Sequence, residues 1–385
     1  MHHLSQRTSH SSGAPFLWIW IGFAIAALVS RFSHGSSVIR IYQEAAQHFL
    51  QGQPLYDASG FLYLPTSAAL LTPIAWLSPE WAGVLIRSFN IALFALGVSS
   101  LGRWRPLRLS ASSAYLGLCM ILVIAWSAAR HGQLTLGMSG LLMLGCVQLE
   151  ERRHWRAGLC LALALALKPI ALPLVLLAVA LHPRALIPCM LGVLALASLP
   201  FALQTPEYVW QVYGEVPGML ARESERAAGP TLRYHLFGML GTLGVHLQPG
   251  VEWLLRAFAA ALTLLMALWL RARRGEPLLA VELYTLGVGY ILLFSPGTER
   301  NTYALLAPCL AHMYWMASQR GRRLIALLVL LIFLAFLFSH SLGKAYPESI
   351  LAMGKPLASL CLLGLFLAWS PEPQETHPAQ IEGVR

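Results

Sequence analysis

The chain has 385 residues, of which 57% are hydrophobic and only 11% are charged, and its mean hydropathy is +0.61. Soluble globular proteins carry about 25% charged residues, so this composition excludes an ordinary soluble protein. The net charge of +10 does not indicate a nucleic-acid partner, because most of it falls in short turns between apolar runs, where membrane topology and anionic lipid headgroups explain it.

Apolar runs that approach the ~20 residues needed to cross a bilayer recur along the chain. The first run, Phe16 to Val29, has no small-residue cleavage site behind it and is predicted to be a retained span, not a signal peptide. We predict an all-α polytopic membrane protein of about twelve transmembrane helices with both termini inside. The spans are expected near 14–32, 80–102, 111–129, 134–150, 157–168, 171–182, 185–203, 251–271, 278–295, 302–319, 323–340 and 349–369.

Two of these runs, 157–168 and 171–182, are each too short to cross ~30 Å of hydrocarbon. Lys168 and Pro169 separate them, so each half is expected to lean on neighbouring helices or to line a cavity. A rival interpretation fuses the two runs into one span and makes 234–248 a span instead. That topology would move the segment 204–233 to the cytoplasm.

The short turns between the spans fall into two chemically different sets. Cytoplasmic loops are enriched in Lys and Arg, so the set that carries almost only Arg is expected inside: Arg103, Arg105, Arg108, Arg152, Arg153, Arg156, Arg184, Arg271, Arg273, Arg274, Arg320, Arg322 and Arg323. The other set carries mixed polar side chains, at residues 42–57 with Tyr63 and Pro65, at 130–133 and at 295–301. The working face is therefore predicted to point away from the cytoplasm.

Two segments of this second set are long, 33–79 and 204–248. In the first, apolar residues recur at helical spacing from Tyr42 to Leu50, which predicts an amphipathic helix in the membrane interface that ends at Gly52. The apolar stretch 63–76, broken by Pro65 and Pro73, is predicted to dip back into the membrane edge. Residues 1–370 are expected to form one transmembrane domain, and 371–385 a disordered cytoplasmic tail.

Two carboxylates in the first long segment are candidates for acid–base chemistry. Asp57 is the chain's sole aspartate, although its surroundings, Tyr56 to Gly60, also have the composition of a turn. Glu44 lies on the polar side of the predicted amphipathic helix, where a solvated face is an equal alternative.

Cationic and polar side chains at the same end suit a phosphate or sugar hydroxyls. Lys168 stands inside an apolar run, and intramembrane charge usually marks a pathway or a site, although the side chain can also extend toward the headgroups. Arg130, His131 and Gln133 form a donor cluster. Glu299 and Arg300 open a later span, where a Glu is also typical of a helix N-terminus.

The sequence gives no sign of metal, nucleotide or serine chemistry. The six cysteines all lie within apolar runs and form no CxxC pattern, so we interpret them as packing residues and predict neither a disulfide nor a metal site. Walker, HExxH and GxSxG motifs are absent from the sequence.

A series of short motifs resembles glycosyltransferase family 87, a family of multi-span GT-C enzymes. The first outer segment carries Tyr42-Gln-Glu-Ala45-Ala46-Gln-His-Phe49-Leu50-Gln-Gly52-Gln-Pro54-Leu55-Tyr56 and then Tyr63-Leu-Pro65. Three later matches follow in the family's order: Gly132-Gln133 opening a span, Lys168-Pro169 closing one, and Ser295-Pro296 with Tyr303 and Pro308. The resemblance runs from about residue 15 to 310.

The resemblance implies a GT-C-like bundle in a bacterial inner membrane. It also implies an inverting transfer of a mannose-like hexose from a polyprenyl-phosphate donor to a lipid or glycan acceptor on the periplasmic face. The lipid-linked sugar is then the substrate, and no cofactor is expected. Such a donor needs cations for its phosphate, with Lys168, Arg130 and Arg300 as candidates, and a carboxylate to deprotonate the acceptor.

Two positions depart from the family's pattern. The family usually has an acidic residue at about Ser37 to Val38, and the histidine often found after Ser-Pro is replaced by Asn301. Glu44, Asp57 or His34 is expected to substitute for the acid. The substrate-binding candidates are His34, Arg40, Tyr42, Tyr63, Arg130, His131, Gln133, Lys168, Glu299 and Arg300.

Two other functions stay open at the level of sequence. A transporter or lipid flippase would also use broken spans and an intramembrane lysine, but it predicts polar groups along a path to both faces, and the inner turns offer almost only Arg with Glu150, Glu151 and Glu276. The missing acid also allows a catalytically inactive relative that binds a lipid-linked sugar.

Overall fold

The computed structural model describes residues 14–30, 38–56, 60–103, 111–228, 234–274, 278–342 and 349–369. All regular elements in these ranges are α-helices or short 3-10 helices, which confirms the all-α prediction for the described part of the chain. His34 and Asp57 lie outside the described residues, and so does the tail 371–385.

The helices follow one another with short connections. In chain order they are α1 (Ala14–Val29), α2 (Ile39–Leu50), α3 (Pro65–Leu71), η2 (Thr72–Ile74), α4 (Pro79–Arg103), α5 (Ala111–His131), α6 (Leu134–Glu150), α7 (His154–Leu167), η3 (Pro169–Ala171), α8 (Leu172–Leu181), η4 (Pro183–Ala185), α9 (Leu186–Ser198), η5 (Leu199–Ala202), α10 (Pro206–Ala228), α11 (Leu236–Thr242), α12 (Pro249–Arg274), α13 (Ala280–Phe294), η6 (Arg300–Leu305), α14 (Leu306–Gln319), α15 (Arg323–Leu342) and α16 (Ser349–Ala368).

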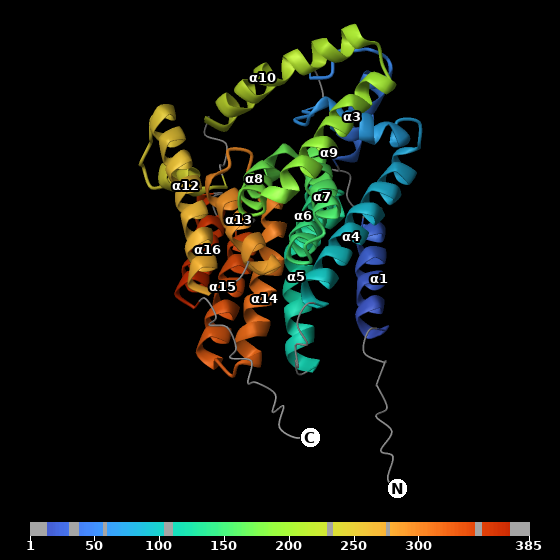
Figure 1. Ribbon diagram of the computed structural model, residues 1–385. Helices are drawn as coiled ribbons and strands as arrows, with labels where there is room; N and C mark the ends of the chain where they lie inside the picture. The colour runs from blue at the N-terminus through green and yellow to red at the C-terminus, as the bar shows by residue number, and fades with distance from the viewer. Residues whose placement is uncertain are drawn as a thin grey trace, which may run out of the picture.

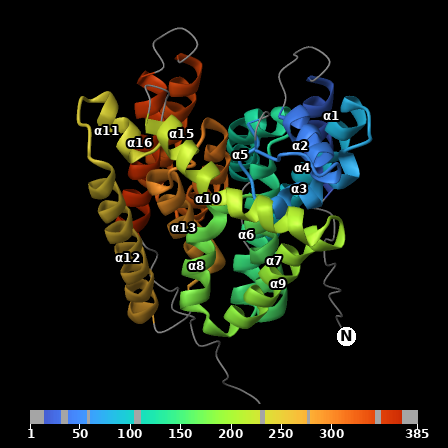
Figure 2. The ribbon, with the colours of Figure 1, turned by 90° about the horizontal axis from the view of Figure 1, so that it is seen from above.

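Most of the apolar helices run side by side, and α10 lies across one end of them (Figure 1). Seen from above, α10 crosses in front of the bundle between the helices of the N-terminal part, drawn in blue, and those of the C-terminal part, drawn in orange and red (Figure 2). Helices α2 and α3 lie at the same end as α10 (Figure 1). We call this the polar end of the bundle.

The described parts of the arginine-rich turns, at 150–156, 181–185, 271–274 and 319–323, lie at the opposite end, which we call the arginine end. There a Glu150 Oε2 accepts a hydrogen bond from the Ala280 N–H at 2.8 Å, and Arg271 Nη1 donates to the Leu181 carbonyl at 3.0 Å. The Arg320 guanidinium lies 5.8 Å from the centre of the Trp369 ring. These contacts join turns that are far apart in the sequence. The side of the membrane that each end faces stays a prediction.

Length and composition give four helices of the described residues that could cross a membrane: Pro79–Leu101, Ser112–His131, Pro183–Ala202 and Pro249–Arg273. Further apolar helices, such as Leu134–Glu150 and Ala280–Phe294, are shorter. A polytopic membrane protein is therefore supported, whereas the figure of twelve spans stays a prediction.

The broken pair of helices forms as predicted, and the rival topology is wrong. Helix α7 ends at Leu167 and α8 begins at Leu172, and between them Lys168 has an extended backbone (φ −152°, ψ 117°). Helix α11 covers only seven residues, Leu236–Thr242, which at 1.5 Å per residue is about 10 Å. The segment 234–248 is consequently too short to span a bilayer.

The amphipathic helix forms as predicted, but its apolar face does not meet lipid. Tyr42, Ala45, Ala46 and Phe49 on α2 are fully buried and pack against α3, η2 and α4. The prediction that this face lies in the membrane interface is therefore corrected, because the bundle itself covers the face. The helix ends before Gly52, whose positive φ of 65° favours glycine.

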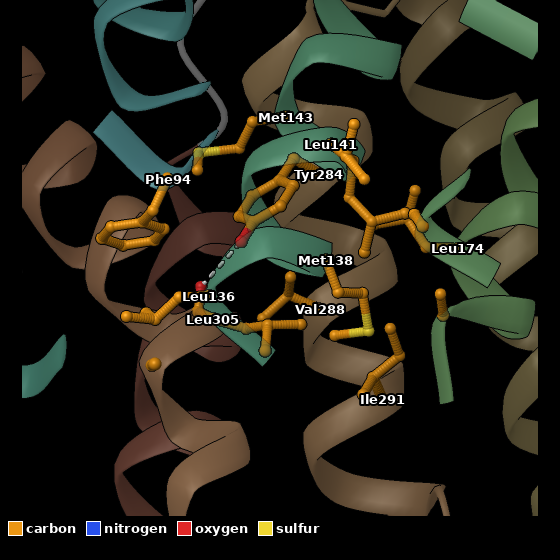
Figure 3. Packing of buried hydrophobic residues seen from close by; sticks show 14 of the residues in the cluster. Phe94, Leu136, Met138, Leu141, Met143, Leu174, Tyr284, Val288, Ile291 and Leu305 are labelled. Atoms are coloured by element: carbon orange, nitrogen blue, oxygen red, sulfur yellow. Dashed lines mark hydrogen bonds between the residues drawn. The ribbon is translucent and has the colours of Figure 1, made fainter. Parts of the chain in front are cut away.

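Helix α6 forms the centre of the packed core. Almost every residue of this helix is buried. Figure 3 shows its Leu136 and Met138 packed among Val288 and Ile291 of α13 and Leu305 of η6. The surrounding helices hold α6 on all sides, and this fixes where its first residues lie at the polar end.

The packing of α4 on α6 depends on glycine. A Cβ added at Gly140 of α6 would overlap the Leu93 carbonyl of α4, and a Cβ at Gly97 would lie 2.7 Å from the Gly140 carbonyl. Small residues allow two membrane helices to approach this closely. Gly22 of α1, in contrast, has no atom within 4 Å of an added Cβ.

We predict that Gly140→Ala destabilises the protein by about 1–3 kcal/mol, because overpacking forces the α4 and α6 backbones apart. Gly22→Ala is the matched control and is expected to be neutral or slightly stabilising, since alanine is the better helix former. Thermal unfolding in detergent measures both. Equal unfolding midpoints for the two variants would contradict the close α4–α6 contact.

Candidate functional site

Two tyrosines from the first outer segment meet at the polar end. The Tyr42 and Tyr63 hydroxyls are 3.1 Å apart, their rings pack edge to face with centres 5.7 Å apart, and the Leu134 N–H donates to the Tyr42 hydroxyl at 3.5 Å. Burial raises the pKa of both phenols above the ordinary value. Both hydroxyls therefore stay neutral at physiological pH and act as hydrogen-bond donors and acceptors.

The Lys168 side chain enters the same region from the end of α7. Its ammonium donates to Thr135 Oγ1 at 3.2 Å, lies 3.6 Å from Glu299 Oε1, and is 5.9 Å from the centre of the Tyr63 ring. Lys168 is only 6% exposed. The structure thus holds this ammonium among protein groups. We call Tyr42, Tyr63, Thr135, Lys168 and Glu299 the Lys168 cluster.

The position of Lys168 follows from the local sequence. Pro169 has no N–H to continue the helix, so α7 ends at Leu167 and the chain turns at Lys168. The last carbonyls of a helix need partners, and Ser67 Oγ of α3 donates to the Ala166 carbonyl at 2.6 Å. Helix α3 therefore joins the end of α7 beside Tyr63.

Glu299 and Arg300 are held at the start of η6. The Glu299 N–H donates to Thr302 Oγ1 at 3.0 Å, and Ser127 Oγ of α5 donates to Asn301 Oδ1 at 2.9 Å. The Glu299 side chain is 48% exposed, in contrast to the buried lysine it faces. This carboxylate is therefore both paired with a cation and accessible from outside the protein.

The Arg130-to-Gln133 turn lies between α5 and α6. Arg130 Nη2 is 3.3 Å from His131 Nε2, and Arg87 Nε donates to the Arg130 carbonyl at 2.9 Å. Gln133 is 6% exposed, and its Oε1 has no hydrogen-bond partner among the described residues. A buried amide oxygen of this kind calls for a hydrogen-bond donor.

Other predicted site residues lie elsewhere. Arg40 and Glu44 are exposed on the face of α2 that turns away from the buried Tyr42, because two residues correspond to about 200° around a helix. The structure does not bring them to the Lys168 cluster. The carboxylate that faces Lys168 is Glu299, which the sequence had suggested only as a substrate-binding residue.

The sequence analysis missed two residues that hold the candidate site residues in place, Lys355 and Thr135. Lys355 of α16 is 1% exposed, and its Nζ donates to the Arg300 carbonyl at 2.8 Å. The signal was present, since Lys355-Pro356 repeats the Lys168-Pro169 pattern in an apolar run. Thr135 gave no signal, because only the fold places its hydroxyl against Lys168.

The arrangement suits an anionic ligand. Lys168, Arg130 and Arg300 bring positive charge to the polar end, and Glu299 is the carboxylate in ion-pair contact with Lys168. Among the described residues, no group of three or more His, Cys, Asp and Glu side chains could hold a metal ion.

We predict that Thr135→Val lowers stability by about 1.5–3 kcal/mol, because it removes an acceptor from a buried ammonium. The cost should shrink to a few tenths of a kcal/mol when Lys168→Met is already present, since the ammonium is then gone. Thermal unfolding of the two single variants and the double variant measures this coupling. Additive losses would show that the hydroxyl does not serve Lys168.

Comparisons with known proteins give the family. The model of glycosyltransferase family 87 matches residues 61–296, a segment longer than half the chain that contains Tyr63, Gln133 and Lys168. The chain is also 29% identical over 181 residues to a polyprenol-phosphate-mannose-dependent alpha-(1-2)-phosphatidylinositol mannoside mannosyltransferase of Mycobacterium tuberculosis. That match covers 40% of this chain and 42% of the relative, so less than half of the relative's length is represented. The chain belongs to glycosyltransferase family 87.

Proposed function

We propose that this protein is a membrane hexosyltransferase that takes a mannose-like hexose from a polyprenyl-phosphate donor and passes it to a lipid or glycan acceptor. In this proposal the reaction takes place at the polar end, which faces the periplasm from a bacterial inner membrane. The observation that carries the proposal is the buried Lys168 ammonium with the half-exposed Glu299 carboxylate at 3.6 Å. A family of glycosyltransferases and a relative whose printed name includes a lipid-linked mannose support the donor class.

Lys168 is the proposed main contact of the donor phosphate. An ammonium is a compact point charge that suits a phosphate oxygen, and Lys168 is already fixed by Thr135 and by Glu299. Arg130 and Arg300 supply further charge. Fixed cations of this kind stabilise the charge that develops on the leaving phosphate.

In the proposed step the acceptor oxygen forms a bond to C1 of the hexose while the bond from C1 to the phosphate oxygen breaks. The polyprenyl phosphate leaves with the bonding electron pair, and the acceptor hydroxyl proton moves to a carboxylate. Attack from the face opposite the phosphate inverts the configuration at C1.

Glu299 is the proposed base, with Asp57 and Glu44 as the alternatives from the first outer segment. A donor phosphate at Lys168 would replace the Glu299 carboxylate as the partner of the ammonium. The carboxylate is half exposed, so it is the partner that can turn toward the acceptor hydroxyl. Tyr63 and Gln133 are the proposed contacts of sugar hydroxyls.

We predict that Lys168→Met keeps expression and folding but weakens donor affinity about 10- to 150-fold, the loss of one charge-assisted phosphate contact. Lys168→Arg should restore only part of the affinity, because a planar fork differs from a point charge. Binding of polyprenyl-phosphate-hexose in lipid nanodiscs measures both. Arg322→Met, which removes one exposed charge at the arginine end, is the control.

Unchanged donor affinity in Lys168→Met would make Lys168 a structural residue and move the phosphate site elsewhere. Transport of the lipid-linked sugar across the bilayer by the wild type, without hexose transfer, would favour the flippase. Donor binding without turnover would favour the inactive relative.

We predict that Glu299→Gln lowers turnover by about 100-fold or more, the usual contribution of a general base, and that it leaves donor affinity within about threefold, a margin near 0.6 kcal/mol. The double variant Glu44→Ala/Asp57→Ala is the comparison. Hexose transfer in nanodiscs measures both. Full turnover by the double variant excludes Glu44 and Asp57 as the base. Loss of turnover in the double variant, with full turnover in Glu299→Gln, would instead assign the base to the first outer segment.

A further inference from the structure

Lys355 is the second buried lysine and, unlike Lys168, it lies within a helix. It lies six residues after the start of α16, is 1% exposed, and is followed within the helix by Pro356. Its position is beyond the segment that matches the family. The proposed chemistry does not use it directly, because its ammonium is closed off from outside the protein.

An aromatic cage surrounds this ammonium. Its Nζ lies 5.1 Å from the centre of the Tyr303 ring, 5.4 Å from Phe336 and 5.5 Å from Tyr234. Cations within about 6 Å of a ring centre are attracted by the negative ring face. Tyr303 also donates its hydroxyl hydrogen to the Tyr234 carbonyl at 2.8 Å, so η6, α15 and the segment before α11 build the cage together.

The polar partner of the caged ammonium is the Arg300 carbonyl, at 2.8 Å. The neighbouring residue, Glu299, pairs with Lys168. Two of the chain's three lysines therefore hold two consecutive residues, one from the end of α7 and one from α16. The start of η6 thus lies between two buried lysines, one on the Arg300 backbone carbonyl and one on the Glu299 side chain. We call the contact of Lys355 with the Arg300 carbonyl the clamp on η6.

Packing alone does not require a charge at position 355. A buried ammonium is costly in an apolar helix, and a methionine of similar length would fill the same space without that cost. The amine has an effect that methionine lacks, since its N–H donates to the Arg300 carbonyl and fixes the backbone from which the guanidinium projects.

We propose that Lys355 is a positioning residue that holds Arg300 for the donor phosphate. The proposal rests on the function proposed above, in which Arg300 contributes to the phosphate site. Lys355 acts through the Arg300 backbone and does not touch the substrate. Its loss should leave η6 in place by packing but allow Arg300 to leave the orientation that the phosphate needs.

The experiment measures binding of polyprenyl-phosphate-hexose in nanodiscs by the wild type, Lys355→Met, Arg300→Ala and the double variant. We expect each single variant to weaken donor affinity about 10- to 100-fold, because each one removes or misplaces a charge-assisted contact with the phosphate. The donor affinity of the double variant should equal that of the single variant with the lower affinity, because Lys355 acts through Arg300. The acceptor KM should not change.

Leu362→Ala is the matched control, because Leu362 is a buried residue of α16 two turns further along the helix. It should lower the unfolding temperature and leave donor affinity as in the wild type. Lys355→Met should show the reverse, with a maintained unfolding temperature and weaker donor binding. The same affinity loss in both variants would overturn the proposal, as would losses from Lys355→Met and Arg300→Ala that simply add.

A second measurement separates this proposal from the proposed function. Hydrogen exchange of the amides in 299–305, measured without donor, should become faster in Lys355→Met and stay unchanged in Leu362→Ala. If exchange is faster in Lys355→Met but the wild type binds no donor, the clamp on η6 is supported and the proposed donor is contradicted. Unchanged exchange and affinity in Lys355→Met, with a wild type that binds and turns over the donor, overturn the clamp and leave the proposed function standing.

Discussion

Two buried lysines, Lys168 at the break after α7 and Lys355 within α16, set the constraint on which the polar end depends. An ammonium in hydrocarbon costs ~2.5–3.5 kcal/mol even on insertion scales, so each lysine needs partners from the protein. Lys168 finds them in Thr135 of α6 and Glu299 before η6, and Lys355 finds the Arg300 carbonyl. These partners come from helices far apart in the sequence. The need to satisfy two charges therefore draws the ends of α6, α7 and α16 onto the same short segment.

The remaining geometry follows from that convergence. Helix α6 is buried along its length, which fixes the position of Thr135, its second residue. Pro169 ends α7 at Leu167, so that Lys168 can reach Thr135. Helix α2 adds the buried Tyr42, and α3 places Ser67 on the last carbonyls of α7. Polar contacts at this end thus join rigid helices, and rigid supports of this kind favour a site whose groups must hold fixed distances.

The sequence predicted the helices well, because apolar periodicity and the Lys168-Pro169 break are local signals. It failed where the outcome depends on what covers a surface. The apolar face of α2 was assigned to the membrane interface, yet α3 and α4 bury it, and amphipathicity alone does not distinguish lipid from protein. The cost of intramembrane charge singled out Lys168, and the same rule applied to Lys355 would have found the second lysine. The partner of Lys168 could not be predicted from the sequence, since Glu299 lies 131 residues further along the chain (299 − 168) and only the fold brings it close.

The balance of charge at the polar end also says how a site of this kind can work. Lys168 is buried and Glu299 is half exposed, so the two members of the pair differ in freedom: the cation is fixed and the carboxylate can move. A pair that is only partly desolvated is held weakly, which allows an incoming phosphate to take the place of the carboxylate at little cost. In the proposed reaction, the carboxylate released by that exchange would remain beside the phosphate and take the proton of the acceptor hydroxyl. Donor binding and activation of the base would then be one event, because both depend on the same ammonium.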